Sequence, residues 1–315
     1  MSVISGLLIA LSVLLVLCWL WTRRLAASAE STVPRAGEIL PVSGGEIHYT
    51  DQGPRDGQAL VLIHGLAGNM HNCTYALAEQ LATDFRVITI DRPGSGYSTR
   101  DRDDLATLPA QAGMIGDFID KLGIEKPVLV GHSLGGALSL AMALDRKDRI
   151  GALALLCPLT AVMPGPPAVF KPLVVRSGIL RRLIGYTVAA PVAKLTSDKV
   201  VAQVFAPEKG PADFMTRGGG ILGLRPSSFI GASTDLQGVT QSMPEQVARY
   251  ENELKVPGGI LFGANDRLLS PDLHGRSMQA YGLLYEELPG RGHMIPVTAP
   301  GECADFIRRM AALAR

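Results

Sequence analysis

The sequence predicts an α/β fold in which a mostly parallel central sheet carries helices on both faces. Apolar strand-like runs alternate with segments of helical spacing over residues 44–157 and again over residues 244–315, a pattern typical of a covered parallel sheet. Between them the alternation stops, and residues 158–243 combine prolines and glycines with helical apolar blocks. The chain also begins with a long uncharged segment. We therefore predict a transmembrane anchor (1–24), a juxtamembrane linker (25–43), an α/β core (44–157 and 244–315) and a helical cap (158–243).

The first element is the N-terminal segment. Residues 3–21 carry no charge, and as a helix they would be about 28 Å long, close to the roughly 30 Å hydrocarbon core of a bilayer. Trp19 and Trp21 are followed by Arg23 and Arg24, which is the order of an interfacial aromatic belt and a charged stop. We expect a single-pass anchor in a bacterial inner membrane.

Two alternatives for this segment stay open: a cleaved signal peptide and a buried core helix. Residues 27–29 (Ala-Ser-Ala) could form a cleavage site, but the basic region that begins a signal peptide is absent. The arginines lie only on the C-terminal flank, which favours a cytoplasmic domain, although the bias is too small to decide the side. Gly6 and Ser12 lack GxxxG spacing, so a homodimer through this helix also stays open.

Composition excludes several classes of protein. Of 315 residues, 47% are apolar and 19% are charged, which is too apolar for a disordered chain. The net charge of +1 argues against nucleic acid as a partner. The four cysteines are too few for a disulfide scaffold and show no CxxC or Cys/His clustering, so we expect no structural metal site.

The core elements follow in order after the linker. Residues 59–64 form a continuous apolar run typical of a buried strand. Residues 105–122 are expected to be helical because Ile115, Phe118 and Ile119 recur on one face. The predicted strands cover residues 46–51, 59–64, 85–91, 127–130, 150–157, 259–266 (with the turn that ends it) and 283–288. The predicted helices cover residues 75–82, 105–122, 135–144 and 300 to the C-terminus.

A candidate nucleophile lies between a predicted strand and a predicted helix. Gly131, His132, Ser133 and Gly135 match G-x-S-x-G, the sharp turn called a nucleophile elbow. Glycines permit the tight turn, and the start of the helix favours developing negative charge. We predict that Ser133 is the nucleophile.

A serine nucleophile needs a base and an orienting carboxylate, which follow it in the order Asp, then His, when it is presented by such an elbow. His293 lies in a glycine-rich loop after a predicted strand, whereas His274 is more typical of a surface helix. Asp266 ends the turn after an apolar strand. A helix-capping role for Asp266 is the alternative. We predict catalytic roles for Asp266 and His293.

Two backbone amides are candidates for an oxyanion hole, which acyl transfer requires. The N–H of Leu66 follows an early apolar strand in a His-Gly-x-x-Gly loop, and the N–H of Leu134 follows the nucleophile. The side chain of His64 is expected to hold this loop. Residues 91–98 form a glycine turn without the pattern of a dinucleotide site.

Residues 64–68, 91–98 and 131–135, with Asp266 and His293, resemble the α/β-hydrolase superfamily over residues 44–315. The resemblance implies the α/β-hydrolase fold, serine hydrolase chemistry and a cap built from the insertion. Haloalkane dehalogenases and epoxide hydrolases carry Asp at the elbow, so Ser133 sets those chemistries aside. The anchor and cap are also similar in architecture to monoacylglycerol-lipase-type and bacterial phospholipase A-type membrane hydrolases.

The predicted cap is basic and apolar. Residues 161–240 contain nine basic and four acidic side chains, a net charge of +5, and the segment 169–192 mixes these cations with large apolar residues. Such a segment is a candidate for lying on an anionic membrane. The alternative is an ordinary cap with its apolar side toward the pocket. Both interpretations favour acyl chains as ligands.

We therefore expect a membrane-anchored serine hydrolase that cleaves lipid-like carboxylic esters through an acyl-serine intermediate, without a metal or organic cofactor. Phospholipids, lysophospholipids and monoacylglycerols are the expected substrates. An acyltransferase, a thioesterase and a general short-chain esterase with the same triad are the alternatives. A non-catalytic binding protein is disfavoured by the intact triad.

Overall fold

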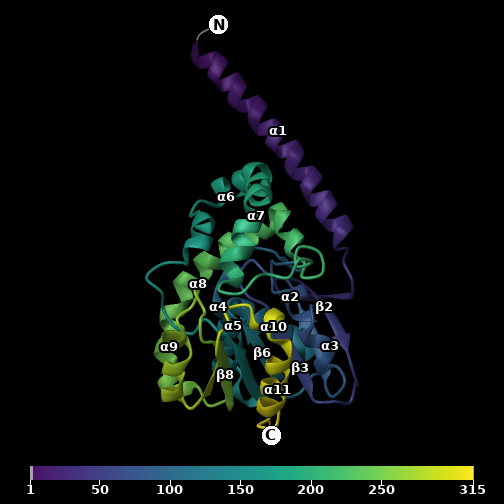
Figure 1. Cartoon of the computed structure of the whole chain (residues 1–315), viewed down its shortest axis with the longest axis vertical. Helices are drawn as coiled ribbons and strands as arrows, with labels where there is room; N and C mark the ends of the chain where they lie inside the picture. Colours follow the sequence, from purple (N-terminus) through teal and green to yellow (C-terminus); the bar gives the residue numbers. More distant parts are fainter. Residues whose placement is uncertain (1–2, 315) are drawn as a thin grey trace.

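The computed structural model describes residues 3–314, which form a nine-stranded sheet between two layers of helices, with a helical cap above it (Figure 1). The strand order is β1-β2-β4-β3-β6-β7-β8-β9, and β5 pairs with β2. Strand β2 pairs antiparallel with β1, β4 and β5. From β4 to β9 along this order, neighbouring strands are parallel. The strands are β1 (Glu38–Val42), β2 (Gly45–Gln52), β3 (Ala59–Ile63), β4 (Arg86–Ile90), β5 (Thr99–Arg100), β6 (Val128–His132), β7 (Ala152–Leu156), β8 (Gly258–Gly263) and β9 (Leu284–Leu288).

Helices cover both faces of the sheet. Helices α4 and α5 pack together on one face, and α2, α3, α10 and α11 pack on the other. The core helices are α2 (His71–Thr74), α3 (Leu77–Leu81), η1 (Asp103–Ala106), α4 (Leu108–Lys121), α5 (Leu134–Asp145), η2 (Lys147–Arg149), α9 (Pro271–His274), η6 (Arg276–Tyr281), α10 (Ile295–Thr298) and α11 (Pro300–Ala311). The cap is built from η3 (Ala168–Leu173), α6 (Gly178–Ile184), η4 (Gly185–Ala189), α7 (Ala190–Phe205), η5 (Gly220–Leu224) and the first part of α8 (Pro226–Glu253).

The predicted α/β fold is confirmed. Every residue of β3, β6, β7 and β8 is buried, as expected for parallel strands with helices on both sides. Because these strands run in the same direction, the segments that follow them meet at one edge of the sheet, where α/β folds place their ligands. Residues 64–68, Ser133 and Asp266 all follow strands at this edge.

Several predicted boundaries differ from the structure. The helix expected over residues 105–122 begins only at Leu108, with a proline in its first turn, where a missing N–H costs nothing. The helix expected over 75–82 is present only as α3, which begins at Leu77 because Ala76 before it has φ −153°, and a separate short helix, α2, precedes it. The expected cap boundary at residue 243 falls within α8. Gln246 of that helix donates to the carbonyl of Ala137 (3.0 Å), so α8 belongs to both cap and core.

The expected linker over residues 25–43 is largely regular structure. Helix α1 (Val3–Thr32) continues past the apolar segment, and β1 occupies Glu38–Val42. One side of this continuation is buried, because Thr22 and Ala29 are buried and Leu25 and Ala26 between them are partly buried. These positions have the spacing of one face of a helix, and their burial stabilises the helical conformation. This face contacts η4, η5 and α7 of the cap.

The apolar part of α1 extends away from the domain (Figure 1). Its most apolar window has a mean hydropathy of 2.8, and none of that window is buried within the chain. A core helix would be buried, so the core-helix alternative is wrong. A membrane anchor and a signal sequence both remain compatible with this helix.

Candidate active site

Ser133 occupies a strained turn between β6 and α5. Its backbone has φ 54° and ψ −118°, a conformation that is uncommon for a residue with a side chain. The turn depends on glycine on both sides. A Cβ atom at Gly131 would lie 2.6 Å from the carbonyl oxygen of Gly135, and one at Gly135 would lie 2.0 Å from that of Ile63. The local sequence therefore forms the elbow that G-x-S-x-G predicts.

His293 and Asp266 form a hydrogen-bonded pair near this turn. His293 Nδ1 donates to Asp266 Oδ2 at 2.6 Å, and Asp266 Oδ1 accepts from the backbone N–H groups of Leu268 (2.8 Å) and Leu269 (3.0 Å). Burial raises the pKa of Asp266, but the charge of His293 and these hydrogen bonds outweigh it and hold the pKa below its ordinary value. An ionised carboxylate on Nδ1 leaves Nε2 of His293 free to accept a proton.

A cavity brings the predicted residues together. Ser133 and His293 line a cavity of about 470 Å³ together with Leu66 and Leu134, and Asp266 is held behind His293 by their hydrogen bond. Leu134 is the first residue of α5, so its N–H has no partner within the helix. The structure thus gathers all five residues for which the sequence predicts chemical roles.

Cys157 lies beside the His293–Asp266 pair. The donor atoms of the three side chains lie within 4.8 Å of one another, a grouping that could suggest a metal site. Burial raises the pKa of the Cys157 thiol well above its ordinary value, and Asp266 raises it further. Because metals bind the thiolate, a protonated thiol beside an already paired carboxylate is a poor ligand set.

His132, the middle residue of the elbow, supports the loop that carries His293. Its Nε2 donates to the backbone carbonyl of His293 at 3.0 Å. Burial and the nearby charge of His293 lower the pKa of His132 to about 3. His132 is therefore neutral at physiological pH and acts as a fixed hydrogen-bond donor.

The loop that carries Leu66 is held by His64 and Arg92. His64 Nδ1 donates to Gly65 O (2.8 Å), and Nε2 accepts from the N–H of Arg92 (3.0 Å). Burial, followed by the charge of Arg92, lowers the pKa of His64 to about 3, so the ring is neutral. Gly65 packs directly on the elbow, since a Cβ there would lie 2.9 Å from Cβ of Ser133.

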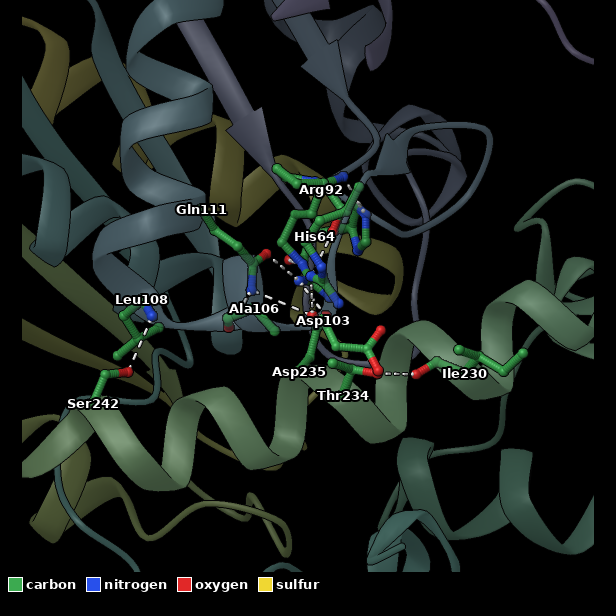
Figure 2. A network of polar contacts seen from close by, with 12 residues as sticks. His64, Arg92, Asp103, Ala106, Leu108, Gln111, Ile230, Thr234, Asp235 and Ser242 are labelled. Carbon is green, nitrogen blue, oxygen red and sulfur yellow. Dashed lines mark hydrogen bonds and ion pairs between the residues drawn. The ribbon is translucent and has the colours of Figure 1, made fainter. Parts of the chain in front are cut away.

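A buried ionic network joins this loop to the cap (Figure 2). Arg92, which is fully buried, donates to the carbonyls of His64 (3.0 Å) and Gly65 (3.1 Å). Its Nη1 donates to Asp235 of α8 (2.7 Å) and Gln111 of α4 (3.2 Å), and Asp235 also accepts from Arg100 (2.7 Å). Sequence reasoning missed this network. The sequence indicates a glycine turn at residues 91–98 and a resemblance to a known family there, but nothing in it relates Arg92 to a residue 143 positions later.

His274 is not the surface residue that the sequence predicts. It is buried, and its Nδ1 accepts from the backbone N–H groups of Thr160 and Ala161, both at 3.2 Å. The prediction was wrong because the start of the cap, at residues 160 and 161, covers His274, whereas Asp272 and Leu273 of the same turn stay exposed. His274 fastens the start of the cap to the core.

This burial predicts a pH effect on stability. Burial lowers the pKa of His274 to about 4, whereas in the unfolded chain a histidine takes up a proton near pH 6.5. Between these pH values the unfolded state binds more protons, so the free energy of unfolding falls as the pH falls. His274→Asn keeps an acceptor but cannot titrate. Between about pH 4 and pH 6.5 we expect the unfolding free energy of His274→Asn to change with pH less steeply than that of the wild type, by about 1 kcal/mol per pH unit.

Denaturant unfolding of the detergent-solubilised chain at several pH values tests this expectation. The wild-type chain is the reference, and the difference between the two slopes is the measured quantity. Equal slopes for His274→Asn and the wild type would show that His274 takes up a proton as readily in the folded state as in the unfolded state, contrary to its burial.

Two cavities meet at Ser133. The second, of about 410 Å³, shares Leu66, Ser133, Phe170, Leu268 and His293 with the first. The first extends along residues 159–167 and α8, and the second extends under α6, η4 and α7. Apart from His132 and His293, Arg176 is the only ionisable side chain that lines either cavity within residues 3–314. The site is therefore two apolar arms that join at one hydroxyl group.

Comparisons with known proteins match these features. Residues 58–186 match the family model described as alpha/beta hydrolase fold. The 2-hydroxy-6-oxononadienedioate/2-hydroxy-6-oxononatrienedioate hydrolase of Burkholderia vietnamiensis is 30% identical over 244 residues, which cover 72% of this chain and 77% of that protein. The carboxylesterase CesB of Bacillus subtilis superposes with a TM-score of 0.67 at 18% identity, covering 93% of this chain and 98% of that one.

A third relative matches only in part. The dihydrolipoyllysine-residue acetyltransferase component of the acetoin cleaving system of Cupriavidus necator is 32% identical over 132 residues, or 42% of this chain. The match spans about a third (34%) of that protein's length.

Proposed function

This chain belongs to the α/β-hydrolase family, and from that premise we propose that it is a membrane-anchored serine hydrolase of apolar carboxylic esters. The observation that carries the proposal is the convergence of Ser133 and the His293–Asp266 pair on an apolar cavity. A serine, a base and an orienting carboxylate are the parts that acyl transfer needs.

In the proposed reaction, Ser133 Oγ attacks the ester carbonyl and His293 Nε2 accepts its proton. The N–H groups of Leu66 and Leu134 stabilise the oxyanion. Collapse breaks the bond to the alcohol oxygen, which takes the proton from His293 and leaves an acyl-serine. Water then attacks the acyl-serine with His293 again as base, and the acid departs as Ser133 regains its proton. Asp266 holds the imidazole in the required tautomer throughout.

The cavity supports an uncharged, apolar substrate. The two arms meet at Ser133, so an ester could place its acyl chain in one arm and its alcohol portion in the other. The relative from Burkholderia vietnamiensis is named for a dienedioate, which carries two carboxylates. A single cation, Arg176, lines the cavities in the described part of the chain, so the lining favours lipid-like esters over a dianion. Phospholipids, lysophospholipids and monoacylglycerols are the proposed substrates.

Helix α1 supports the anchor. Its apolar part is exposed, whereas the buried Thr22 and Ala29 pack on the cap. Thr22 Oγ1 donates to the carbonyl of Thr187 (2.6 Å), and Glu30 pairs with Arg225 (3.0 Å). Cleavage after Ala29 would remove most of the side of α1 that packs on the cap. We propose a retained single-pass anchor in a bacterial inner membrane.

Hydrolysis by the detergent-purified full chain tests the substrate class. We expect turnover of monoacylglycerols, lysophospholipids or diacyl phospholipids, and a kcat/KM that rises about tenfold for each two methylenes added to the acyl chain until the arm is full. A 2-hydroxy-6-oxo-dienedioate serves as the comparison substrate. Preference for the dienedioate, or turnover of short esters alone, would contradict the lipid-ester proposal.

Acyl transfer is a second candidate, because one partial relative is an acetyltransferase component and the acyl-serine could pass its acyl group to an alcohol or thiol. Added alcohol or thiol distinguishes the two functions. Free acid as the main product at all acceptor concentrations supports a hydrolase, and acylated acceptor as the main product supports a transferase.

A further inference from the structure

The outer side of α6 and α7 is apolar and exposed. Among the exposed large apolar residues of α6, α7 and the η4 turn between them are Ile179 (85% exposed), Leu183 (50%), Tyr186 (52%) and Leu195 (75%). The inner side of the same helical run is also apolar, because Ile184 and Val188 line the cavity that ends at Ser133. Large apolar side chains that gather on the exposed side of a helix normally mark a surface that contacts a membrane or a partner. Within residues 3–314, nothing covers the outer side.

The position of α1 identifies what covers this side. The apolar segment of α1 ends at Trp21, and the next residue, Thr22, donates to the carbonyl of Thr187 in η4, between α6 and α7. The cap helices are therefore attached to α1 where it would leave the bilayer. Figure 1 shows α1, α6 and α7 together at one end of the molecule, with α9 near the opposite end.

The charges on these helices fit an anionic surface. Lys194 and Lys199 are exposed on α7, against one exposed carboxylate, Asp198. Arg182 of α6 is also exposed but pairs with Asp103 (3.0 Å). Arg23 and Arg24 on α1 are also exposed. Apolar side chains with basic residues beside them are the composition of a helix that lies in the headgroup region of a membrane.

We propose that the outer side of α6 and α7, defined by Ile179, Leu183, Tyr186 and Leu195, is inserted into the surface of the bilayer that α1 spans, and that apolar substrates reach the 410 Å³ cavity from the membrane. This inference rests on the proposed anchor and deepens the proposed function. Only the α6–η4–α7 layer, about 10 Å thick, separates this membrane-facing side from the cavity. The substrate class is a lipid already in the bilayer.

Spin labels test the location without requiring activity. The full chain with Cys18→Ser is placed in nanodiscs that contain anionic phospholipid, and a single cysteine is introduced at Leu183 or at Leu273. The native Cys73, Cys157 and Cys303 are buried. Leu273 is the matched control, because it is 45% exposed but lies in α9, outside the α6–η4–α7 run.

We expect the label at Leu183 to collide with dissolved oxygen and to be shielded from a water-soluble nickel complex, and the label at Leu273 to show the reverse. Equal access of nickel to both positions would overturn the proposal. Shielding of Leu183 from both reagents, with dimers in the nanodiscs, would also overturn it, because a second copy of the chain would then cover this side.

Activity provides an independent test. The double variant Leu183→Glu/Leu195→Glu should lose about tenfold in kcat/KM on a substrate embedded in vesicles, since it weakens apolar insertion, and should keep its activity on a water-soluble short ester. Leu273→Glu/Leu284→Glu should change neither. Unchanged hydrolysis of the embedded substrate by the first variant would contradict the proposal. If the wild-type chain hydrolyses no ester, the proposed function fails while the spin labels still decide the docking surface.

Discussion

Replacing Ser133 with alanine is expected to lower kcat/KM for ester hydrolysis by about 10⁴-fold or more, because loss of the nucleophile removes the covalent route. Asp266→Asn should lower it by about 10³- to 10⁴-fold, because Asp266 Oδ2 accepts the hydrogen bond that fixes the tautomer of His293. The double variant should be no slower than Ser133→Ala alone, since residues that act as one unit are not additive. The measurement is kcat/KM on a water-soluble short ester for Ser133→Ala, Asp266→Asn and the double variant.

The control is Ser277→Ala, which removes an exposed hydroxyl whose hydrogen bond is to the carbonyl of Leu273. It should retain wild-type activity. A fluorophosphonate probe should label the wild-type chain and Ser277→Ala but not Ser133→Ala. Full activity or full labelling of Ser133→Ala would assign the nucleophile elsewhere, and an unlabelled wild-type chain would favour a non-catalytic binding protein.

Replacing Asp235 with asparagine is expected to have the largest effect on stability. Asp235 is fully buried and accepts from both Arg92 and Arg100, so the change leaves two buried or nearly buried guanidinium groups without a counterion. Breaking a buried ion pair from one side typically costs about 3–5 kcal/mol. Denaturant unfolding of the detergent-solubilised variant measures the loss. Asp104→Asn, which removes an exposed partner of Arg102, should change stability by no more than about 0.5 kcal/mol.

The same variant tests how the cap affects the site. Arg92 holds the carbonyls of His64 and Gly65 next to Leu66, so a displaced Arg92 should disturb the proposed oxyanion hole. Below the unfolding transition we expect Asp235→Asn to lower kcat more than it raises KM, because the oxyanion forms only after substrate is bound. A variant with wild-type stability would show that Arg92 is paired adequately by Gln111 and backbone carbonyls.

The local patterns were sufficient for much of the fold and of the candidate site. The buried run of β3 and the G-x-S-x-G turn are local features, and the structure has both where they were expected. Asp266 and His293 followed from their places after strands, because parallel strands end at one edge. Their catalytic roles, with those of Ser133, Leu66 and Leu134, stay predictions that the kinetic experiments test.

The remaining features depend on contacts between distant segments. His274 is buried only because residues 160 and 161 return to it, and β1 forms within the expected linker because β2 pairs with it. The boundary within α8 could not be found because one helix packs against both cap and core. Periodicity in the sequence reports which side of an element is apolar, but not which partner covers it.

For this protein, the sequence by itself determined the α/β alternation, the strained turn at Ser133 and the apolar N-terminal segment, since each depends on neighbouring residues and on their spacing. Only the tertiary structure decided that Arg92 and Asp235 join the cap to the loop of Leu66, and that α1 packs on η4, η5 and α7 of the cap. These contacts link residues more than a hundred positions apart. Such pairs form when whole elements pack to bury apolar surface, and no local pattern encodes them.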